Sequence, residues 1–159
     1  GSVYHKMEQY DDALEHLDES LATAETTNDD QRIANVLSDI ADVYLARGEN
    51  EEAREYYTRS LQVAQRVGYR RREALALLGI GTVCIRVDDI DAARETVVRA
   101  LRIAEELGAR DLLYRAHHSL AFACECRGEY QQALIHLRAH QHYKEEVFNE
   151  ESDRTLKKV

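Results

Sequence analysis

Small and large apolar residues recur along this chain at helical spacing and with a period of 40 residues. Each of four alanines is followed four positions later by a large apolar side chain, and positions four apart share one face of an α-helix. These pairs are Ala13 and Leu17, Ala53 and Tyr57, Ala93 and Val97, and Ala133 and Leu137. The pattern predicts the same helix four times over, the second helix (helix B) of a repeated unit.

A different stripe, spaced by three and four, predicts a first helix (helix A) in each unit. Its members are Leu37, Ile40, Ala41 and Tyr44, then Leu77, Ile80, Gly81 and Cys84, then His117, Leu120, Ala121 and Cys124. A polar turn at 47–50, matched at 87–90 and 127–130, is short enough to make helices A and B antiparallel. Gly68 and Gly108 fall where a left-handed residue would end helix B, and residues 28–30 offer a cap to the next helix.

Small residues at fixed places separate the repeat families that a period of 40 leaves open, among them HEAT and armadillo repeats. The unit at 31–68 carries a large apolar residue, a second one, a small one, an aromatic, a glycine turn, then alanine, an aromatic and a small residue. These are Leu37, Ile40, Ala41, Tyr44, Gly48, Ala53, Tyr57 and Ser60. This resembles the tetratricopeptide repeat in its longer-unit branch, seen in bacterial transcription activators, peptide-sensing regulators and animal G-protein signalling modulators.

The resemblance covers about residues 3–147 and implies an all-α fold, a right-handed superhelix of antiparallel helix pairs. It departs from the family in lacking tryptophan and proline, and His117 stands where a large apolar residue belongs. We expect about three and a half repeats, at 3–27, 31–68, 70–108 and 110–147. Residues 1–2 are interpreted as a cloning scar, and Val3–Lys6 as the end of a truncated helix A.

The last helix B is predicted to continue into an extension at 148–159. A stripe of Phe148, Ser152, Thr155 or Leu156, and Val159 follows coiled-coil spacing there. The extension is either the start of a coiled-coil linker, which would allow a homodimer through this helix, or a plain capping helix that covers the last repeat.

Composition narrows the partners and the compartment. The net charge of −9 disfavours long nucleic acid, which needs a basic stripe. No apolar run approaches the roughly 20 residues that a membrane span requires, and no signal peptide opens the sequence. Three cysteines, an odd number without disulfide spacing, fit a reducing compartment. The chain is therefore predicted to be cytoplasmic.

Few residues suggest chemistry. His136 and His140, four apart, are either two ligands of one zinc ion or a solvent-facing pair, and no third ligand is evident. The buried-looking Cys84 and Cys124 share a repeat position, which favours packing over a redox role. Arg70–Arg72 is either a solvated turn or a contact for phosphate or an acidic peptide. Without a nucleophile motif or phosphate loop, the sequence predicts no enzyme, no cofactor and no metal.

The resemblance implies that the A helices line a concave groove that binds a protein or peptide segment. Its inward positions would be Asn35, Ser38, Asp42 and Leu45, then Leu75, Leu78, Thr82 and Ile85, then Arg115, His118, Phe122 and Glu125. The apolar members would form an exposed strip for an apolar segment, with Arg115 and Asp42 setting its orientation. The alternative is that superhelical curvature buries them. The Lys, Asn and Arg residues with which tetratricopeptide cochaperones grip a C-terminal carboxylate are missing at these places.

Residues 143–151 resemble the stretch that closes tetratricopeptide arrays in bacterial signalling proteins, ahead of a diguanylate cyclase, an adenylate or guanylate cyclase, or a histidine kinase. That resemblance implies a non-catalytic regulatory input domain, whose signal passes through the C-terminal helix. The alternative is a free-standing adaptor or scaffold protein.

Overall fold

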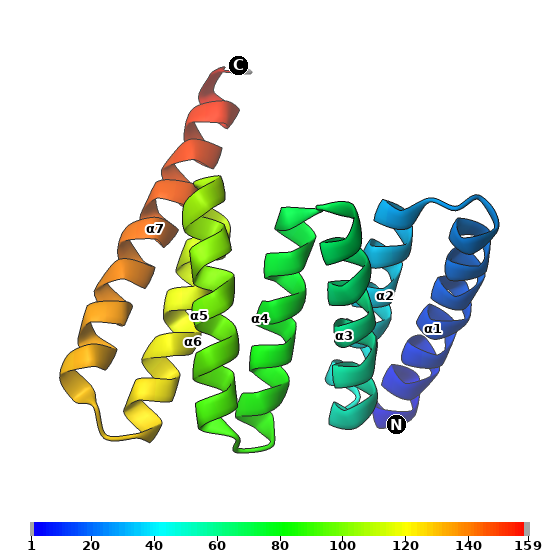
Figure 1. Cartoon of the computed structure of the whole chain (residues 1–159), viewed down its shortest axis with the longest axis horizontal. Coiled ribbons are helices and arrows are strands. Elements are labelled where there is room, and N and C mark those ends of the chain that lie inside the picture. Colours follow the sequence, from blue (N-terminus) through cyan, green and yellow to red (C-terminus); the bar gives the residue numbers. More distant parts are fainter. Residues whose placement is uncertain (1, 158–159) are drawn as a thin grey trace.

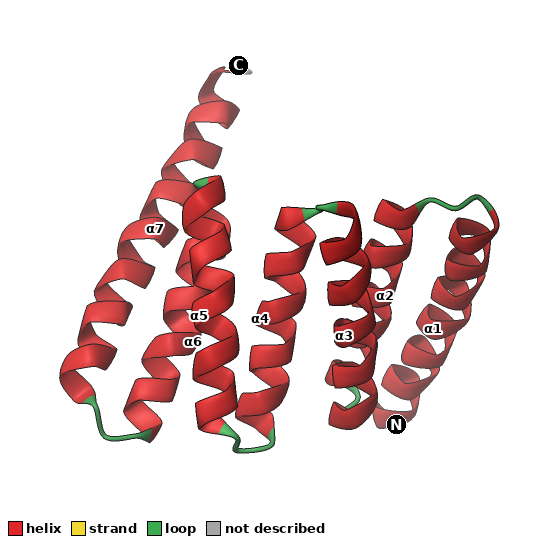
Figure 2. Ribbon diagram, viewed as in Figure 1, coloured by secondary structure: helices red, strands yellow, loops and turns green. Residues whose placement is uncertain are grey.

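The computed structural model describes residues 2–157, and these form seven α-helices joined by short turns (Figures 1 and 2). The helices are α1 (Ser2–Thr26), α2 (Asp30–Ala46), α3 (Asn50–Val67), α4 (Arg70–Arg86), α5 (Ile90–Leu107), α6 (Arg110–Cys126) and α7 (Tyr130–Lys157). Helices α2, α4 and α6 are the predicted A helices, and α3, α5 and α7 are the B helices that follow them. The all-α expectation is confirmed.

Consecutive helices pack antiparallel in a row, so each unit touches only its neighbours (Figure 1). Successive A helices also contact one another, α2 with α4 and α4 with α6. The core runs along the row as a continuous layer, in which Ile40, Leu77, Val97 and Leu112 are at most 1 % exposed. This arrangement makes stability depend on nearest-neighbour contacts, as in other helical repeat arrays.

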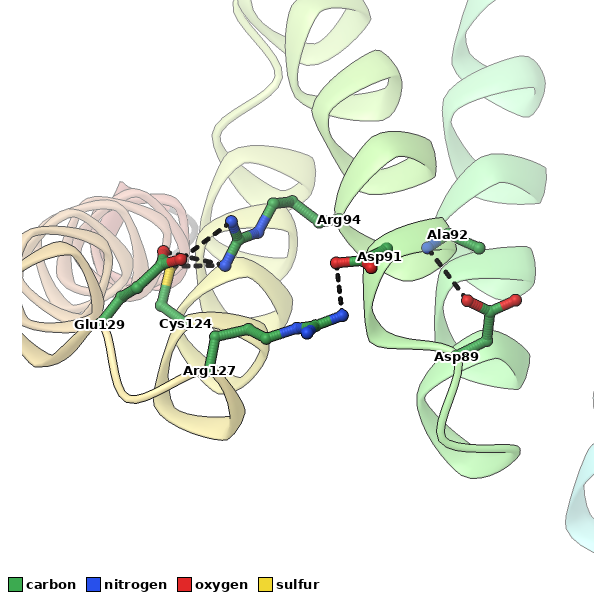
Figure 3. Close-up of polar contacts among 7 residues, drawn as sticks. All are labelled: Asp89, Asp91, Ala92, Arg94, Cys124, Arg127 and Glu129. Atoms are coloured by element: carbon green, nitrogen blue, oxygen red, sulfur yellow. Dashed lines mark hydrogen bonds and ion pairs between the residues drawn. The ribbon is translucent and has the colours of Figure 1, made fainter.

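The predicted helix ends are confirmed by the backbone. Gly68 and Gly108 adopt φ of 71° and 62° after α3 and α5, a left-handed conformation that glycine adopts without the clash of a Cβ atom. At the other end, the Asp29 carboxylate accepts a hydrogen bond from the Arg32 amide at the start of α2. Asp89 does the same for the Ala92 amide in α5 (Figure 3). These caps satisfy helix-end groups that the ladder leaves unpaired.

Small residues on α4 let it approach both neighbouring B helices closely. A Cβ atom placed on Gly81 would lie 2.5 Å from Val97 Cγ2 of α5. A Cβ atom on Gly79 would lie 2.5 Å from the Tyr57 ring of α3. Real Cβ atoms essentially never come so close, so α4 can pack at this distance only with glycine at these positions.

One prediction about the N-terminus is wrong. Val3–Lys6 does not end a separate helix A, because α1 is continuous from Ser2 to Thr26. In the second and fourth units the turn between helices A and B uses a glycine with positive φ, such as Gly48 at 80°. The equivalent residue 40 positions earlier is Glu8, which disfavours that conformation and continues the helix instead.

The predicted extension of the last helix is confirmed as far as Lys157, because α7 runs 28 residues without a break. Its C-terminal part projects past the ends of α5 and α6 (Figure 1). Phe148 and Leu156 are 69 % and 71 % exposed there, whereas the predicted stripe member Val159 lies outside the described residues. Within residues 2–157, none of the helices has the length and apolar character needed to cross a membrane.

Candidate peptide-binding groove

All twelve predicted groove residues lie on α2, α4 and α6, the three A helices that contact one another in sequence. Their exposure differs. Exposed are Asp42, Arg115, His118, Phe122 and Glu125; half-buried are Asn35, Leu45, Leu75, Thr82 and Ile85; buried are Ser38 and Leu78. The fold therefore brings these residues onto adjacent helices, with the most accessible apolar side chain, Phe122, at 46 % exposure on α6.

The predicted exposure of Leu78 is wrong, since this side chain is only 3 % exposed. It belongs to the core cluster that joins α4 to α5 and α6. Successive A helices pack closely enough to cover it, as curvature of a solenoid does. The apolar strip is consequently reduced to Phe122 and the half-buried Leu45, Leu75 and Ile85.

A cavity of about 210 Å³ opens between α4, α6 and α7. It is lined by four of the predicted residues and three others: Leu78, Thr82, Arg115 and His118, with Tyr114, Ser119 and His140. His140 comes from a B helix, and sequence reasoning placed no B-helix residue here. The repeat register could have indicated this contact, because His140 and Ser60 occupy the same position two units apart. His140 Nδ1 lies 2.7 Å from the Tyr114 carbonyl oxygen, and Ser60 donates a hydrogen bond to the equivalent Ala34 carbonyl oxygen.

Hydrogen bonds fix several polar groups of the groove. The Tyr57 hydroxyl donates to Asp42, and burial together with this carboxylate raises the pKa of Tyr57. Arg72 Nε donates to Asn35 Oδ1 at 2.8 Å, and Arg86 donates to the Leu45 carbonyl oxygen at 2.6 Å. Both arginines reach from α4 to α2, so they tie the two A helices together.

Arg115 differs from three other arginines that lie between helices. It is exposed at the rim of the cavity and forms no ion pair within 4.0 Å among residues 2–157, whereas Arg71, Arg94 and Arg110 are all paired. A guanidinium with free donors can bind a carboxylate with two parallel hydrogen bonds. The groove therefore combines a partly exposed apolar strip with one cation available to an anionic group.

The histidines pair across the α6–α7 seam in a way that the sequence did not predict. His117 Nδ1 lies 3.0 Å from His136 Nδ1, and the rings of His118 and His140 are 4.9 Å apart. The expectation that His136 and His140 form a solvent-facing pair is wrong, because both are half-buried and they contact different partners. No cluster of three metal-ligating side chains occurs among the described residues.

Arg70, Arg71 and Arg72 form neither a solvated turn nor an open anion site. Arg70 pairs with Glu73 and Glu106, and Arg71 pairs with Asp111. The third arginine, Arg72, is the one that bonds Asn35 on α2. The pairs between units share one feature of the sequence: an acidic residue lies 36 to 40 positions from an arginine. The same spacing occurs in the pairs Asp91–Arg127, drawn in Figure 3, and Arg110–Glu146.

Cys84 and Cys124 are buried, at 3 % and 4 % exposure, which confirms the predicted packing role. An arginine of the preceding B helix lies over each thiol: Arg54 is 3.7 Å from Cys84 Sγ, and Arg94 is 4.0 Å from Cys124 Sγ. Burial raises the pKa of both thiols, with the arginine as a smaller opposing effect. Arg94 also pairs with Glu129, so this contact joins α5 to the turn after α6 (Figure 3).

The arrangement of helices defines a helical repeat protein, and a family model identifies which one. The tetratricopeptide repeat model matches residues 1–66 and 72–146, nearly the whole chain. The chain belongs to the tetratricopeptide repeat family. Such domains generally bind proteins and are typically non-catalytic.

Solved structures share this fold at low sequence identity. BtubC (BKLC) from P. vanneervenii is 20 % identical with a TM-score of 0.76, over 92 % of this chain and 61 % of that one. The apo form of RapI is 18 % identical with a TM-score of 0.80, over 91 % of this chain and 40 % of that one. The chain thus spans less than two thirds of either relative. No curated protein matches the sequence.

Proposed function

We propose that this chain is a non-catalytic regulatory domain that binds a protein or peptide segment in the groove formed by α2, α4 and α6. The observation that carries the proposal is the combination on α6 of the unpaired Arg115, which lines the α4–α6–α7 cavity, with the exposed Phe122 seven residues further along the same helix. Apolar contact supplies affinity in such grooves and a single charge supplies direction. The preferred ligand is an apolar segment with an acidic group that reaches Arg115.

The groove charges favour one orientation of that segment. The Asp42 carboxylate on α2 already accepts a hydrogen bond from the Tyr57 hydroxyl, and Glu125 lies exposed near the end of α6. An acidic ligand group is repelled by these carboxylates and attracted to Arg115, which lies among the cavity residues on α6. Asp42 then faces a neutral or basic part of the ligand.

We further propose that the domain is the cytoplasmic input module of a larger bacterial signalling protein, with α7 carrying the signal onward. The length of α7 and its exposed Phe148 support a role for the extension beyond covering the last repeat. The alternative is a free-standing adaptor. Sequencing the parent gene past the codon for Val159 separates them: a cyclase or kinase motif supports the input module, and an early stop codon supports the adaptor.

Selection of binders from a random peptide library on the immobilised chain tests the groove. Selected peptides are then titrated against the wild type, Phe122→Ser, Arg115→Gln and the control Ile135→Ser, which removes an apolar side chain of similar exposure from α7. We expect the two groove variants to weaken binding at least about tenfold, or 1.4 kcal/mol, and the control to leave it unchanged. Equal binding by all four proteins contradicts the proposal.

A further inference from the structure

Each B helix that is followed by another unit presents one face to the next A helix. On α5, which is covered by α6, this face includes Arg94, whose guanidinium lies 4.0 Å from the Cys124 thiol of α6. On α3, which is covered by α4, it includes Arg54, which lies 3.7 Å from the Cys84 thiol, and Tyr57, whose ring packs against Gly79. The same interface is therefore used twice along the array, at positions 40 residues apart.

The equivalent face of α7 is uncovered within residues 2–157, because α7 lies at one end of the row (Figure 1). Tyr130, Leu134 and Leu137 occupy it at spacings of four and three, and they are 72 %, 48 % and 37 % exposed. We call these three residues the end face. Their spacing places them along one side of the first two turns of α7.

The end face is apolar only in this first part. Farther along α7, Gln141 and Lys144 stand where α5 has Leu101 and Ala104, so polar residues replace the apolar ones there. In the first part the replacement runs the other way, because Leu134 stands where α3 and α5 carry Arg54 and Arg94. Solvent exposure alone does not favour leucine over arginine at this position, whereas contact with another apolar surface does.

We propose that the end face binds an amphipathic helix of a partner protein, antiparallel to α7, as α4 lies against α3 and α6 against α5. The proposal rests on continuity with these two interfaces. It also specifies the partner: Gly79 of α4 faces Tyr57, the counterpart of Leu137, without room for a Cβ atom. The bound helix therefore carries a small residue opposite Leu137, either glycine as in α4 or serine as at the equivalent Ser119 of α6, and apolar residues three or four positions away on the same side.

A second copy of this chain fits the end face less well. Two end faces in contact would oppose large side chains to large side chains, since Tyr130, Leu134 and Leu137 include no small residue. Close approach of helices requires a small residue at the crossing, as at Gly79 and Gly81. The proposed partner is thus a helix like α4 or α6 from another protein, and it binds independently of the groove.

The experiment uses a fluorescent peptide with the sequence of residues 70–86, with serine in place of its cysteine, as the helix probe. Its binding to the full chain is followed by fluorescence anisotropy for the wild type, Leu134→Arg and Phe122→Ser. Arginine is the residue found at this position in α3 and α5, so L134R is expected to fold, which circular dichroism verifies. We expect saturable binding that L134R weakens at least about tenfold, or 1.4 kcal/mol, and that F122S leaves unchanged. A peptide with leucine in place of Gly79 is expected to bind as weakly as the probe binds L134R.

Several results would overturn the proposal. Absence of saturable binding to the wild type would do so, as would equal binding by L134R, because the probe would then contact some other surface or exchange with α4 itself. Loss of binding in F122S would place the probe in the groove rather than on the end face. Concentration-dependent dimerisation that L134R abolishes would identify a second copy as the occupant.

Discussion

Gly79 and Gly81 determine how closely α4 packs between its two neighbouring B helices. Of the two, Gly79 contacts a side chain that cannot move aside, because Tyr57 is 2 % exposed and its hydroxyl is bound to Asp42. Alanine normally stabilises a helix by about 1 kcal/mol over glycine. At this position the tyrosine ring and the new methyl group would occupy the same space, so steric overlap outweighs helix propensity.

We predict that Gly79→Ala lowers the free energy of unfolding by about 1–3 kcal/mol, the usual cost of overpacking. Urea denaturation followed by circular dichroism measures it. Tyr57→Leu, which shortens the side chain facing Gly79, provides the background control: the alanine substitution is expected to cost less there. A stability gain of the size that propensity alone gives would contradict the close contact.

Substitution of Ala53 tests whether the repeat pattern assigns the correct residues of α3 to the buried face. It is fully buried, with 0 % exposure, at the early small position of α3, and Glu51 is exposed two residues before it. Ala53→Arg is predicted to cost more than about 4 kcal/mol of unfolding free energy, and Glu51→Arg to change it by less than about 0.5 kcal/mol. The same denaturation measurement compares them, and equal effects would refute the register.

Helices α6 and α7 meet at His117 and His136, and His117 stands where the other units carry Leu37 and Leu77. Burial lowers the pKa of His117 and His136 below 6.5, and the neighbouring His136 lowers that of His117 further. The other groups near them are Arg94 on α5, and His140 and Tyr143 on α7. As neutral rings 3.0 Å apart, one Nδ1 donates a hydrogen bond to the other, which two imidazolium ions cannot do.

The sign of the pH dependence follows from the lowered pKa. Below pH 6.5 the unfolded chain binds more protons at these histidines than the folded chain does, so acid favours unfolding. We predict that the unfolding free energy falls as the pH drops through 6.5 towards the folded-state pKa values. In the double variant His117→Leu/His136→Leu this part of the pH dependence should disappear. Urea titrations at several pH values measure it, and an identical slope in both proteins would contradict the prediction.

Helix boundaries were readable from the sequence because each follows from local chemistry: Gly68 and Gly108 end helices, and Asp29 begins one. The start of α1 could not be read in this way. The repeat register places a turn near Glu8, but the chain continues as a helix there because glutamate favours a helix over the left-handed turn. The arginine triplet was also misread. Its partners Glu106 and Asp111 are distant in sequence, and only the stacking of units brings them close.

Over the whole array, ion pairs between units repeat with the fold. Arg47 pairs with Asp11, Arg127 with Asp91, and Arg110 with Glu146, each pair 36 residues apart. Such partly exposed pairs contribute little individually, so burial of the continuous apolar layer supplies most of the stability. The sequence correctly predicted that the twelve groove residues lie on the A helices α2, α4 and α6. The burial of Leu78 depends on how closely successive A helices approach, and no local pattern reports that distance.

The largest-scale prediction concerns the projecting part of α7. Phe148 and Leu156 are exposed on this part, and the stripe of Phe148, Ser152 and Thr155 or Leu156 follows the three- and four-residue spacing of a coiled coil, so burial of these side chains between two such helices would stabilise a dimer. If this segment is a coiled-coil linker, sedimentation velocity should show a dimer at high concentration, and Phe148→Glu/Leu156→Glu should return it to the 18.3 kDa monomer. Lys144→Glu, an exposed change on the same helix, is the control and should leave the dimer intact. A monomer at every concentration would instead make this segment a capping helix, because a cap covers its own repeat and needs no second chain. The apolar residues of the extension would then have no partner in a dimer, and the signalling proposal would lose the structural support that the exposed Phe148 gives it.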